Sequence, residues 1–321
     1  MTTSRAATAH GARWRIIKDI MGGCLGNLLE WYDWFVYTAF ALYFAEVFFP
    51  RGDRTAQLLN AAAVFAVGFL MRPLGSWLMG LYADRAGRRA ALVLSMTIMA
   101  LGSLAVALTP SYDNIGFFAP LMLLLARVAQ GLGLGGQYAA VATYLSEMAG
   151  RERRGLVASF QYVTLITGQL VALALLILLQ NLLTPTQLTA WGWRVPFLIG
   201  SLGTVGAYWM RRGIDESRAF EAVQRRATPV ETWKLMAQHR REMLIVLGLT
   251  MGGTLGFYTF STYMQQFLAN TSGFSKDTAT GIIAAAMVLF MCTQPLMGWI
   301  SDKIGRRPLL IAFGVLGTLF T

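Results

Sequence analysis

The sequence predicts an all-α polytopic membrane protein built from two similar helical bundles. Of the 321 residues, 55% are hydrophobic and only 13% are charged, whereas soluble domains average about 25% charged residues. Apolar runs follow one another along the chain, most of them near the ~20 residues that a membrane helix needs. The segment Gly80–Arg89 recurs as Gly298–Arg307, each time between two apolar runs, and this repeat indicates two halves of similar construction.

The apolar runs predict the position of each helix. In the first half they cover residues 20–49, 57–82, 90–109, 118–147, 155–182 and 192–211, and in the second half 243–268, 278–301 and a run that begins at Leu309. We therefore expect a polar tail (1–18), a six-helix bundle (19–211), a charged connector (212–242) and a second bundle (243–321). The run at 309–321 is too short to span a membrane, so we expect the second bundle to be incomplete, with about three helices.

Lys and Arg gather on one side of the predicted spans. They are frequent in the N-terminal tail, the connector and the loops near residues 85–89, 151–154 and 303–307, and sparse in the alternate loops. This asymmetry predicts a cytoplasmic N-terminus, and it accounts for the net charge of +11 without a nucleic acid as partner. The two Cys and two His are scattered, so we expect no disulfide framework, metal site or cofactor.

Two carboxylates lie well inside the first predicted helix. Glu30 and Asp33 are three residues apart, so they share one helix face. An ionised carboxylate near the bilayer centre costs about 2.5–3.5 kcal/mol, and two on one face indicate a wet or paired setting. The interpretation we favour is that they carry protons, because burial and approaching cations shift a carboxyl group between its two states. The alternative is a static pair bonded to the backbone or to an Arg of a neighbouring helix.

Two arginines also fall inside predicted helices. Arg127 has a permanent charge and a planar fork of donors that matches a carboxylate, so we expect it to bind an anionic substrate or to couple to a buried carboxylate. The alternative is an ion pair that only packs helices, and the same two interpretations hold for Arg72. Three polar side chains are candidates for substrate contact or for ordinary hydrogen bonds between helices: Tyr32, Gln161 and Tyr258.

The repeated segment predicts a pair of gate loops. In each copy an Asp at a helix end precedes a Gly-containing turn and two basic residues. Such an Asp can accept hydrogen bonds from the N-terminal amides of a neighbouring helix, where the helix dipole favours negative charge. We expect this contact to latch the cytoplasmic side closed in one state, although turn chemistry with basic anchoring is an alternative. The residues concerned are Gly80, Asp84, Arg85, Gly87, Arg88, Gly298, Asp302, Gly305 and Arg306.

At these residues the chain resembles the major facilitator superfamily, whose repeated loop motif is G-x-x-x-D-(R/K)-x-G-(R/K)-(R/K). The segments GNLLEWYDW, FLMRPLG, ARVAQGLGLGG and WGWRVPF resemble the metabolite:proton symporter family within it. SFQYVTLITGQL and FYTFSTYMQ are similar to its 2-oxoglutarate-carrying members. The resemblance implies a major-facilitator two-bundle fold in the bacterial inner membrane. It also implies uptake of 2-oxoglutarate or a related acid together with protons.

The resemblance further implies roles for single residues. Glu30, Asp33 and Arg127 match charged positions of the family's helices one and four, which points to proton coupling. Glu147 and Arg154 join Asp84, Arg88 and Asp302 in the cytoplasmic gate, and Asp302 is expected to meet the start of the fifth helix near Gly155. Gln137 stands where the family has Glu; because Gln cannot titrate, we assign the proton role to the first helix.

The leading hypothesis is therefore proton-coupled uptake of a dicarboxylate by alternating access. The expected partners are a small carboxylate, protons and the lipid bilayer, and we expect a monomer. An enzyme is not expected, because no clustered nucleophile, His pair or metal site is present in the sequence. Two alternatives remain: the same fold carrying proline or betaine, citrate or shikimate, and a truncated fragment that does not transport on its own.

Overall fold

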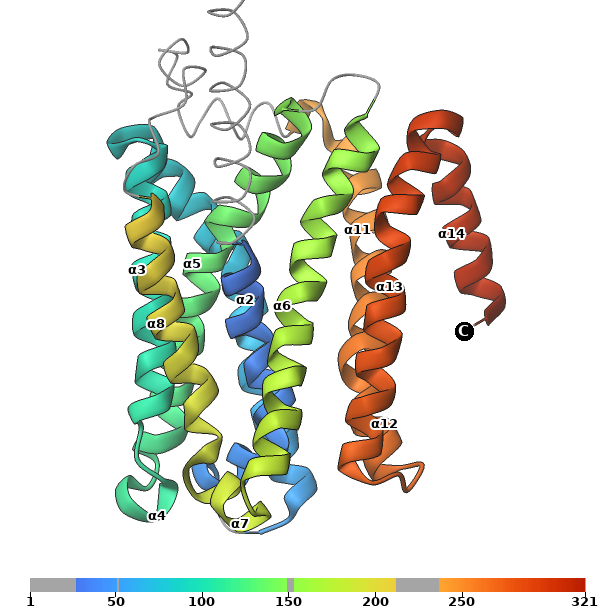
Figure 1. Cartoon of the computed structure of the whole chain (residues 1–321). Coiled ribbons are helices and arrows are strands. Elements are labelled where there is room, and N and C mark those ends of the chain that lie inside the picture. Colours follow the sequence, from blue (N-terminus) through green and yellow to red (C-terminus); the bar gives the residue numbers. More distant parts are fainter. Residues whose placement is uncertain (1–26, 51, 149–152, 212–236, 321) are drawn as a thin grey trace, which may run out of the picture. The chain divides into compact units, whose positions relative to one another are not determined.

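The computed structural model describes residues 27–50, 52–148, 153–211 and 237–320, with side chains except at 84, 88–89, 92, 136–148, 207–211, 270, 276 and 320. Every secondary-structure element in these ranges is a helix (Figure 1). They are a helix over 27–48, α2 (Arg54–Ala86), α3 (Arg88–Leu108), α4 (Tyr112–Ile115), α5 (Phe118–Met148), α6 (Arg154–Leu182), α7 (Pro185–Gln187), η1 (Leu188–Gly192), α8 (Arg194–Arg211), α11 (Arg240–Tyr258), η2 (Thr259–Tyr263), α12 (Met264–Asn270), α13 (Lys276–Ile304) and α14 (Arg306–Phe320). The predicted all-α fold class is confirmed.

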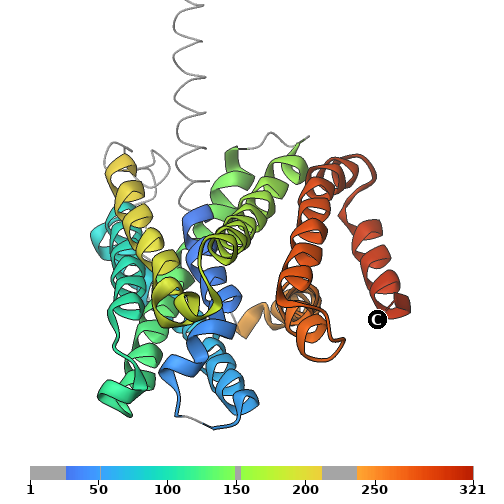
Figure 2. The same cartoon turned by 60° about the horizontal axis from the view of Figure 1, so that its bottom comes forward.

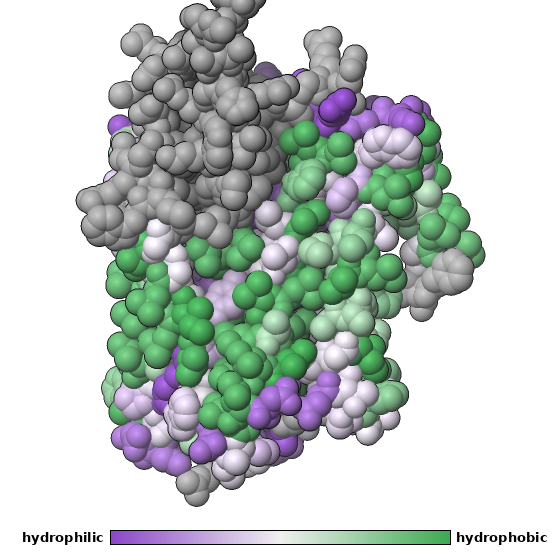
Figure 3. Space-filling view, viewed as in Figure 1, coloured by the Kyte–Doolittle hydropathy of each residue, from purple (hydrophilic) through white to green (hydrophobic). Residues whose placement is uncertain are grey.

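Several of these helices are suited to a bilayer. Five described segments are long and apolar enough to cross a membrane: Arg54–Ala83, Phe118–Gly135, Arg154–Leu182, Arg240–Ala269 and Asp277–Ile304. Val93–Leu108 is a shorter apolar helix. On the face shown in Figure 3, hydrophobic side chains cover the middle of the helices and hydrophilic ones gather at their ends. A lipid-facing surface has this distribution, because apolar side chains cost nothing in hydrocarbon and charged ones do.

The structure also adds detail to the predicted helices. The helix expected over 243–268 is present as the continuous span Arg240–Ala269, which contains the π-helical segment η2 between α11 and α12. Another π-helical segment, η1, precedes α8. The short α7 begins with a capping box in which Thr184 and Gln187 exchange hydrogen bonds, with Pro185 as its first residue. Such short elements carry no periodic apolar pattern, so the search for membrane-length runs does not detect them.

The described chain forms two compact units. The first contains the helices between 27 and 211 together with Met287–Arg306 of α13, and the second contains the described residues of 215–286 and 307–321. In the first unit the helix over 27–48 is the most buried element. Its aromatic residues Trp34, Phe40, Phe44 and Phe48 are completely covered, and Glu30 and Asp33 are buried on the same helix.

Small residues let the other helices of this unit approach closely. A side chain at Gly68 of α2 would collide with the ring of Trp34. On α2, a side chain at Gly75 would collide with the backbone of α5, and on α5 a side chain at Gly131 or Gly135 would collide with the backbone of α2. Backbone contact of this kind is how membrane helices gain packing energy without a hydrophobic driving force between them. Figures 1 and 2 both show α2 and α5 side by side. The crossing brings Arg72 of α2 and Arg127 of α5 toward the buried helix.

Candidate functional site

Asp33 is the centre of a buried polar cluster in the first unit. Its side chain is only 2% exposed, and both carboxylate oxygens accept hydrogen bonds. Oδ1 accepts from the hydroxyl of Ser103 on α3, and Oδ2 accepts from Nε2 of Gln130 on α5 at 2.5 Å. Arg127, also on α5, is within electrostatic reach of the carboxylate. One carboxylate thus joins three helices, which satisfies the requirement that a buried charge be hydrogen-bonded and compensated.

Arg127 is fully buried, yet its donors are unused. Its exposure is 0%, and Nε, Nη1 and Nη2 donate to no acceptor among the described residues. The guanidinium instead lies on aromatic faces, with Cζ 3.8 Å from the ring centroid of Tyr37 and 5.7 Å from that of Trp34. The hydroxyl of Tyr37 donates to the carbonyl of Ala61 at 2.8 Å, which fixes this ring. A buried cation with free donors is suited to an anion that enters from outside the protein.

Arg72 contacts the same indole as Arg127. Its Cζ lies 4.0 Å from the centroid of Trp34, 4.1 Å from that of Phe69 and 5.3 Å from that of Trp31. Cation–π contacts of this length attract a guanidinium to the face of an aromatic ring. Trp34 therefore joins two positive charges from α2 and α5.

The remaining candidates on the first helix and α6 are Glu30, Tyr32 and Gln161, and all three are buried. Glu30 is buried, as predicted for a carboxylate of the first helix. The hydroxyl of Tyr32 donates to the carbonyl of Pro196 on α8 at 2.9 Å, so this donor already serves a contact between helices. Gln161 is buried on α6, and its backbone carbonyl accepts from Asn27 at 3.3 Å. The roles predicted for these residues in substrate binding stay predictions.

Tyr258 belongs to the second unit and ends α11 directly before η2. Ser261, within η2, is buried, and on α12 the buried Gln265 donates to Thr280 of α13 at 2.9 Å. A π-helical turn shifts the register of the residues that follow it and is frequent at functional sites. The structure thus places Tyr258 at an irregular, polar point of its helix.

The repeated segment folds into the same turn twice. Gly87 has φ 94° and Gly305 has φ 89°, values that favour glycine, and they join α2 to α3 and α13 to α14. The amide of Gly87 donates to the carbonyl of Ala83, and the amide of Gly305 donates to that of Ser301. The matching positions of the two copies therefore have matching conformations, which is what an internal repeat predicts.

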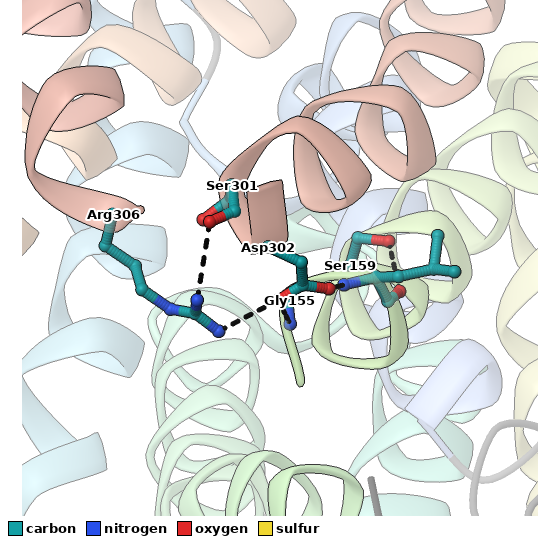
Figure 4. Close-up of polar contacts among 6 residues, drawn as sticks. Gly155, Ser159, Ser301, Asp302 and Arg306 are labelled. Carbon is teal, nitrogen blue, oxygen red and sulfur yellow. Dashed lines mark hydrogen bonds and ion pairs between the residues drawn. The ribbon is translucent and has the colours of Figure 1, made fainter. Parts of the chain in front are cut away.

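Asp302, in the second copy, caps the start of α6 (Figure 4). Its Oδ1 accepts from the amide of Gly155 at 2.7 Å and its Oδ2 from the amide of Leu156 at 2.9 Å. Arg306 donates to the same carboxylate at 3.1 Å from the opposite side. These amides belong to the first turn of α6, which has no intrahelical acceptor for them. The expected meeting of Asp302 with the start of this helix is confirmed.

Close backbone approach makes this contact feasible. A side chain at Gly298 would lie 2.6 Å from the carbonyl oxygen of Gly155, and one at Gly155 would lie 2.6 Å from that of Gly298. The two glycines therefore bring the end of α13 against the start of α6, where the Asp302 carboxylate can reach both amides.

The other predicted gate residues are less informative. Gly80, Arg85 and Arg154 are exposed at or near helix ends. The backbones of Asp84, Arg88, Gln137 and Glu147 are helical, but their side chains lie outside the described set. Their gate roles, and the consequence drawn from Gln137, stay predictions.

The sequence analysis missed the residues that complete the cluster around Asp33. Ser103, Gln130, Trp34 and Tyr37 provide its hydrogen bonds and the aromatic faces under Arg127. A signal existed for Gln130, which follows Arg127 by three residues and so shares its helix face. The others are ordinary residues of apolar helices, and only the register between helices reveals their contacts.

Comparison with known proteins identifies the class. The Major Facilitator Superfamily matches residues 23–321, so the chain belongs to this family of transporters. It is 48% identical over 321 residues to the Alpha-ketoglutarate permease of Escherichia coli (strain K12), covering 100% of this chain and 74% of that protein. The Proline/betaine transporter of the same strain is 33% identical over 310 residues, covering 92% of this chain and 62% of that protein.

Two further comparisons concern a relative named for another acid and a solved structure. The Citrate-proton symporter of Klebsiella pneumoniae is 33% identical over 310 residues, covering 97% of this chain and 69% of that protein. The proton:xylose symporter XylE bound to 6-bromo-6-deoxy-D-glucose superposes with a TM-score of 0.70 at 20% identity, covering 92% of this chain and 70% of that chain. This second likeness shows the fold alone. The predicted family is confirmed, and the chain spans between 62% and 74% of the length of the curated relatives cited.

Proposed function

We propose that this chain takes up a dicarboxylate, 2-oxoglutarate, together with protons across the bacterial inner membrane by alternating access. The observation that carries the proposal is Arg127, a fully buried guanidinium whose donors meet no acceptor among the described residues and which interacts electrostatically with the buried carboxylate of Asp33. We further propose a monomer. The distribution of Lys and Arg residues supports an N-terminus in the cytoplasm.

The first step of the mechanism is recognition of the anion. A guanidinium offers paired N–H donors in a planar fork, which matches the two oxygens of a carboxylate. These donors have no acceptor in the part of the chain that the structure describes, so an incoming carboxylate displaces none of the described hydrogen bonds. Arg72 places a second guanidinium on the same indole. An anion is thus better matched to the site than a zwitterion.

The second step is coupling to the proton. When Asp33 is ionised it competes with the substrate for the charge of Arg127, and when it is protonated it leaves that charge to the substrate. Protonation of Asp33 and binding of the anion therefore favour each other, and by linkage the effect is reciprocal. Such mutual stabilisation is the thermodynamic basis of symport, and Glu30 on the same helix face is a further candidate carrier.

Relatives support this substrate class without deciding it. The Alpha-ketoglutarate permease is similar over all of this chain, and a Citrate-proton symporter is among the other relatives. The Proline/betaine transporters are similar at a lower identity. The structural argument for an acid over a betaine is the buried guanidinium of Arg127, because an ammonium group beside it would be repelled.

Competition binding tests the substrate class. We expect the purified chain in lipid nanodiscs to bind labelled 2-oxoglutarate saturably. We expect unlabelled 2-oxoglutarate to displace it, whereas betaine and proline at the same concentration leave it bound. Displacement by betaine or proline, or the absence of saturable binding, would contradict the proposal. Stronger displacement by citrate or shikimate would assign the cargo to another acid.

The gate proposal assigns Asp302 and the α6 amides to a latch that breaks during transport. Asp302→Asn keeps the shape of the side chain but removes the charge and one acceptor, so we expect the open fraction to rise roughly tenfold, since a hydrogen bond to a charged group contributes about 1.5–3 kcal/mol. The readout is the distance distribution between nitroxide labels attached after Arg153→Cys and Lys303→Cys, with Cys24→Ser and Cys292→Ser in the background.

Asp277→Asn is the matched control, because Asp277 is an exposed carboxylate in the first turn of the same helix. If the contact is a latch, we expect a second, longer distance between the two nitroxide labels in Asp302→Asn alone. Identical distributions in the unsubstituted chain, Asp302→Asn and Asp277→Asn would show that the contact is a static helix cap.

A further inference from the structure

Ser103 lies between two acceptors. Its hydroxyl donates to Oδ1 of Asp33, and the carbonyl of Phe197 on α8 lies 3.2 Å from the same hydroxyl oxygen. A hydroxyl has one hydrogen and two lone pairs, so it can donate in one direction while accepting from the other. Rotation about a single bond therefore moves the hydrogen from Asp33 to Phe197 without moving any heavy atom.

Gln130 likewise has a second hydrogen-bonding group that does not contact Asp33. Its Nε2 donates to Oδ2 of Asp33 at 2.5 Å, whereas its Oε1 is buried and has no hydrogen-bond partner among the described residues. An amide carries a donor and an acceptor at one end of the side chain, and a half turn exchanges them. A buried acceptor without a partner is uncommon in a well-packed protein and calls for an explanation.

We propose, building on the proton role given to Asp33 in the proposed function, that Ser103 and Gln130 are positioning residues that serve both protonation states of Asp33. In the ionised state both donate to the carboxylate, as the structure shows. When a proton binds Oδ1, the new O–H donates to the hydroxyl oxygen of Ser103, and Ser103 donates to the carbonyl of Phe197. When it binds Oδ2, the half turn of Gln130 offers Oε1 as acceptor. No covalent bond other than the O–H of Asp33 forms or breaks.

The surroundings leave room for this exchange. Gly200 of α8 faces the pair, and a side chain there would lie 2.9 Å from Oδ1 of Asp33 and 3.4 Å from the Ser103 oxygen. The glycine thus keeps the space beside both groups clear.

Two charged or titratable groups of the described residues interact with Asp33: Arg127 on α5 and Tyr32 on its own helix. Arg72 on α2 and Tyr37 on the same helix as Asp33 lie around the same Trp34 and Arg127 side chains, and Glu30 lies three residues before Asp33. The described groups of α3 and α8 that reach it, Ser103, Phe197 and Gly200, are uncharged. Ser103 and Gln130 can therefore respond to a proton on Asp33 without taking it up themselves.

The test compares Ser103→Ala and Gln130→Leu with Thr204→Val. Thr204 is a buried hydroxyl of the same unit that donates only within its own helix, to Gly200 at 2.8 Å, so its loss controls for removal of a buried polar group. The first readout is the ratio of the dissociation constants for labelled 2-oxoglutarate at alkaline and acid pH. We expect this ratio to fall about tenfold in each of the two variants, equivalent to one unit of proton affinity, and to stay unchanged in Thr204→Val.

The second readout needs no ligand. Infrared spectra of the chain in nanodiscs, recorded over a pH titration, contain the C=O band of protonated Asp33, identified by its loss in Asp33→Asn. We expect this band at a higher frequency in Ser103→Ala and in Gln130→Leu, because the carboxyl group loses a hydrogen bond, and at an unchanged frequency in Thr204→Val. An unchanged band in both test variants would overturn the inference.

The two readouts separate failure of the inference from failure of the proposed function. If the unsubstituted chain binds 2-oxoglutarate without pH dependence, the coupling fails, and the infrared result alone decides whether Ser103 and Gln130 serve both states of Asp33. If binding depends on pH and the variants keep the full ratio, the proposed function stands and the inference is wrong.

Discussion

Arg127→Gln is expected to weaken binding of labelled 2-oxoglutarate by at least about 100-fold, because removing one member of a buried charge pair at a binding site typically costs about 2–5 kcal/mol. Gln keeps polarity and some length but loses the charge and the paired donors. The affinity of Arg127→Lys for 2-oxoglutarate is expected to lie between those of Arg127→Gln and the unsubstituted chain, since Lys keeps the positive charge but lacks the paired N–H donors of Arg. Equilibrium binding to the purified chain in nanodiscs measures all three.

Arg194→Gln controls for the loss of an arginine elsewhere in the same unit. Arg194 donates to the carbonyls of Ala190 and Thr109, and we expect Arg194→Gln to bind 2-oxoglutarate as the unsubstituted chain does.

A second control separates loss of binding from loss of stability. Arg127→Gln leaves Asp33 buried without its counter-charge, which destabilises the fold by about 3–5 kcal/mol. The double variant Asp33→Asn with Arg127→Gln removes both charges, so it should recover thermal stability without recovering binding. Full affinity in Arg127→Gln would refute the anion site.

Asp33→Asn is expected to make the binding of 2-oxoglutarate independent of pH. Asn matches Asp in shape, and its carbonyl can still accept from Ser103 or Gln130, so the cluster keeps its geometry. The side chain cannot titrate, and it no longer competes for the charge of Arg127. We therefore expect affinity for 2-oxoglutarate at alkaline pH to rise to the level that the unsubstituted chain reaches only at acid pH. Asp277→Asn, at the exposed start of α13, should leave the pH dependence unchanged.

The fold was largely predictable because membrane helices are constrained by length and charge. The run predicted over 155–182 matches α6 (Arg154–Leu182), and the run over 57–82 lies within α2 (Arg54–Ala86). Apolar runs have to span the bilayer, and charged or turn-forming residues interrupt them at its surfaces. The π-helical segment η2 was not predictable, since it leaves no mark on hydropathy and depends on how neighbouring helices pack.

The candidate site was predictable only in its charges. Asp33 and Arg127 stood out because an ionisable group inside an apolar run is expensive and seldom retained without a purpose. Ser103 and Gln130 are inexpensive in such a run, and their contacts with Asp33 cross 70 and 97 positions of sequence. The cation–π contacts of Tyr37 and Trp34 likewise depend on the close crossing of α2 with α5. A sequence pattern therefore reveals which buried groups are energetically costly. It does not reveal which residues of neighbouring helices provide their hydrogen bonds.

The most direct test of the coupling between Asp33 and the anion at Arg127 is proton uptake on substrate binding. Unlabelled 2-oxoglutarate is added to the purified chain in weakly buffered solution that contains a pH indicator dye. We expect the unsubstituted chain and Asp277→Asn to take up protons as 2-oxoglutarate binds, and we expect Asp33→Asn to bind the substrate without proton uptake. Equal proton uptake in Asp33→Asn, or saturable binding to the unsubstituted chain with no uptake at any pH, would contradict this coupling.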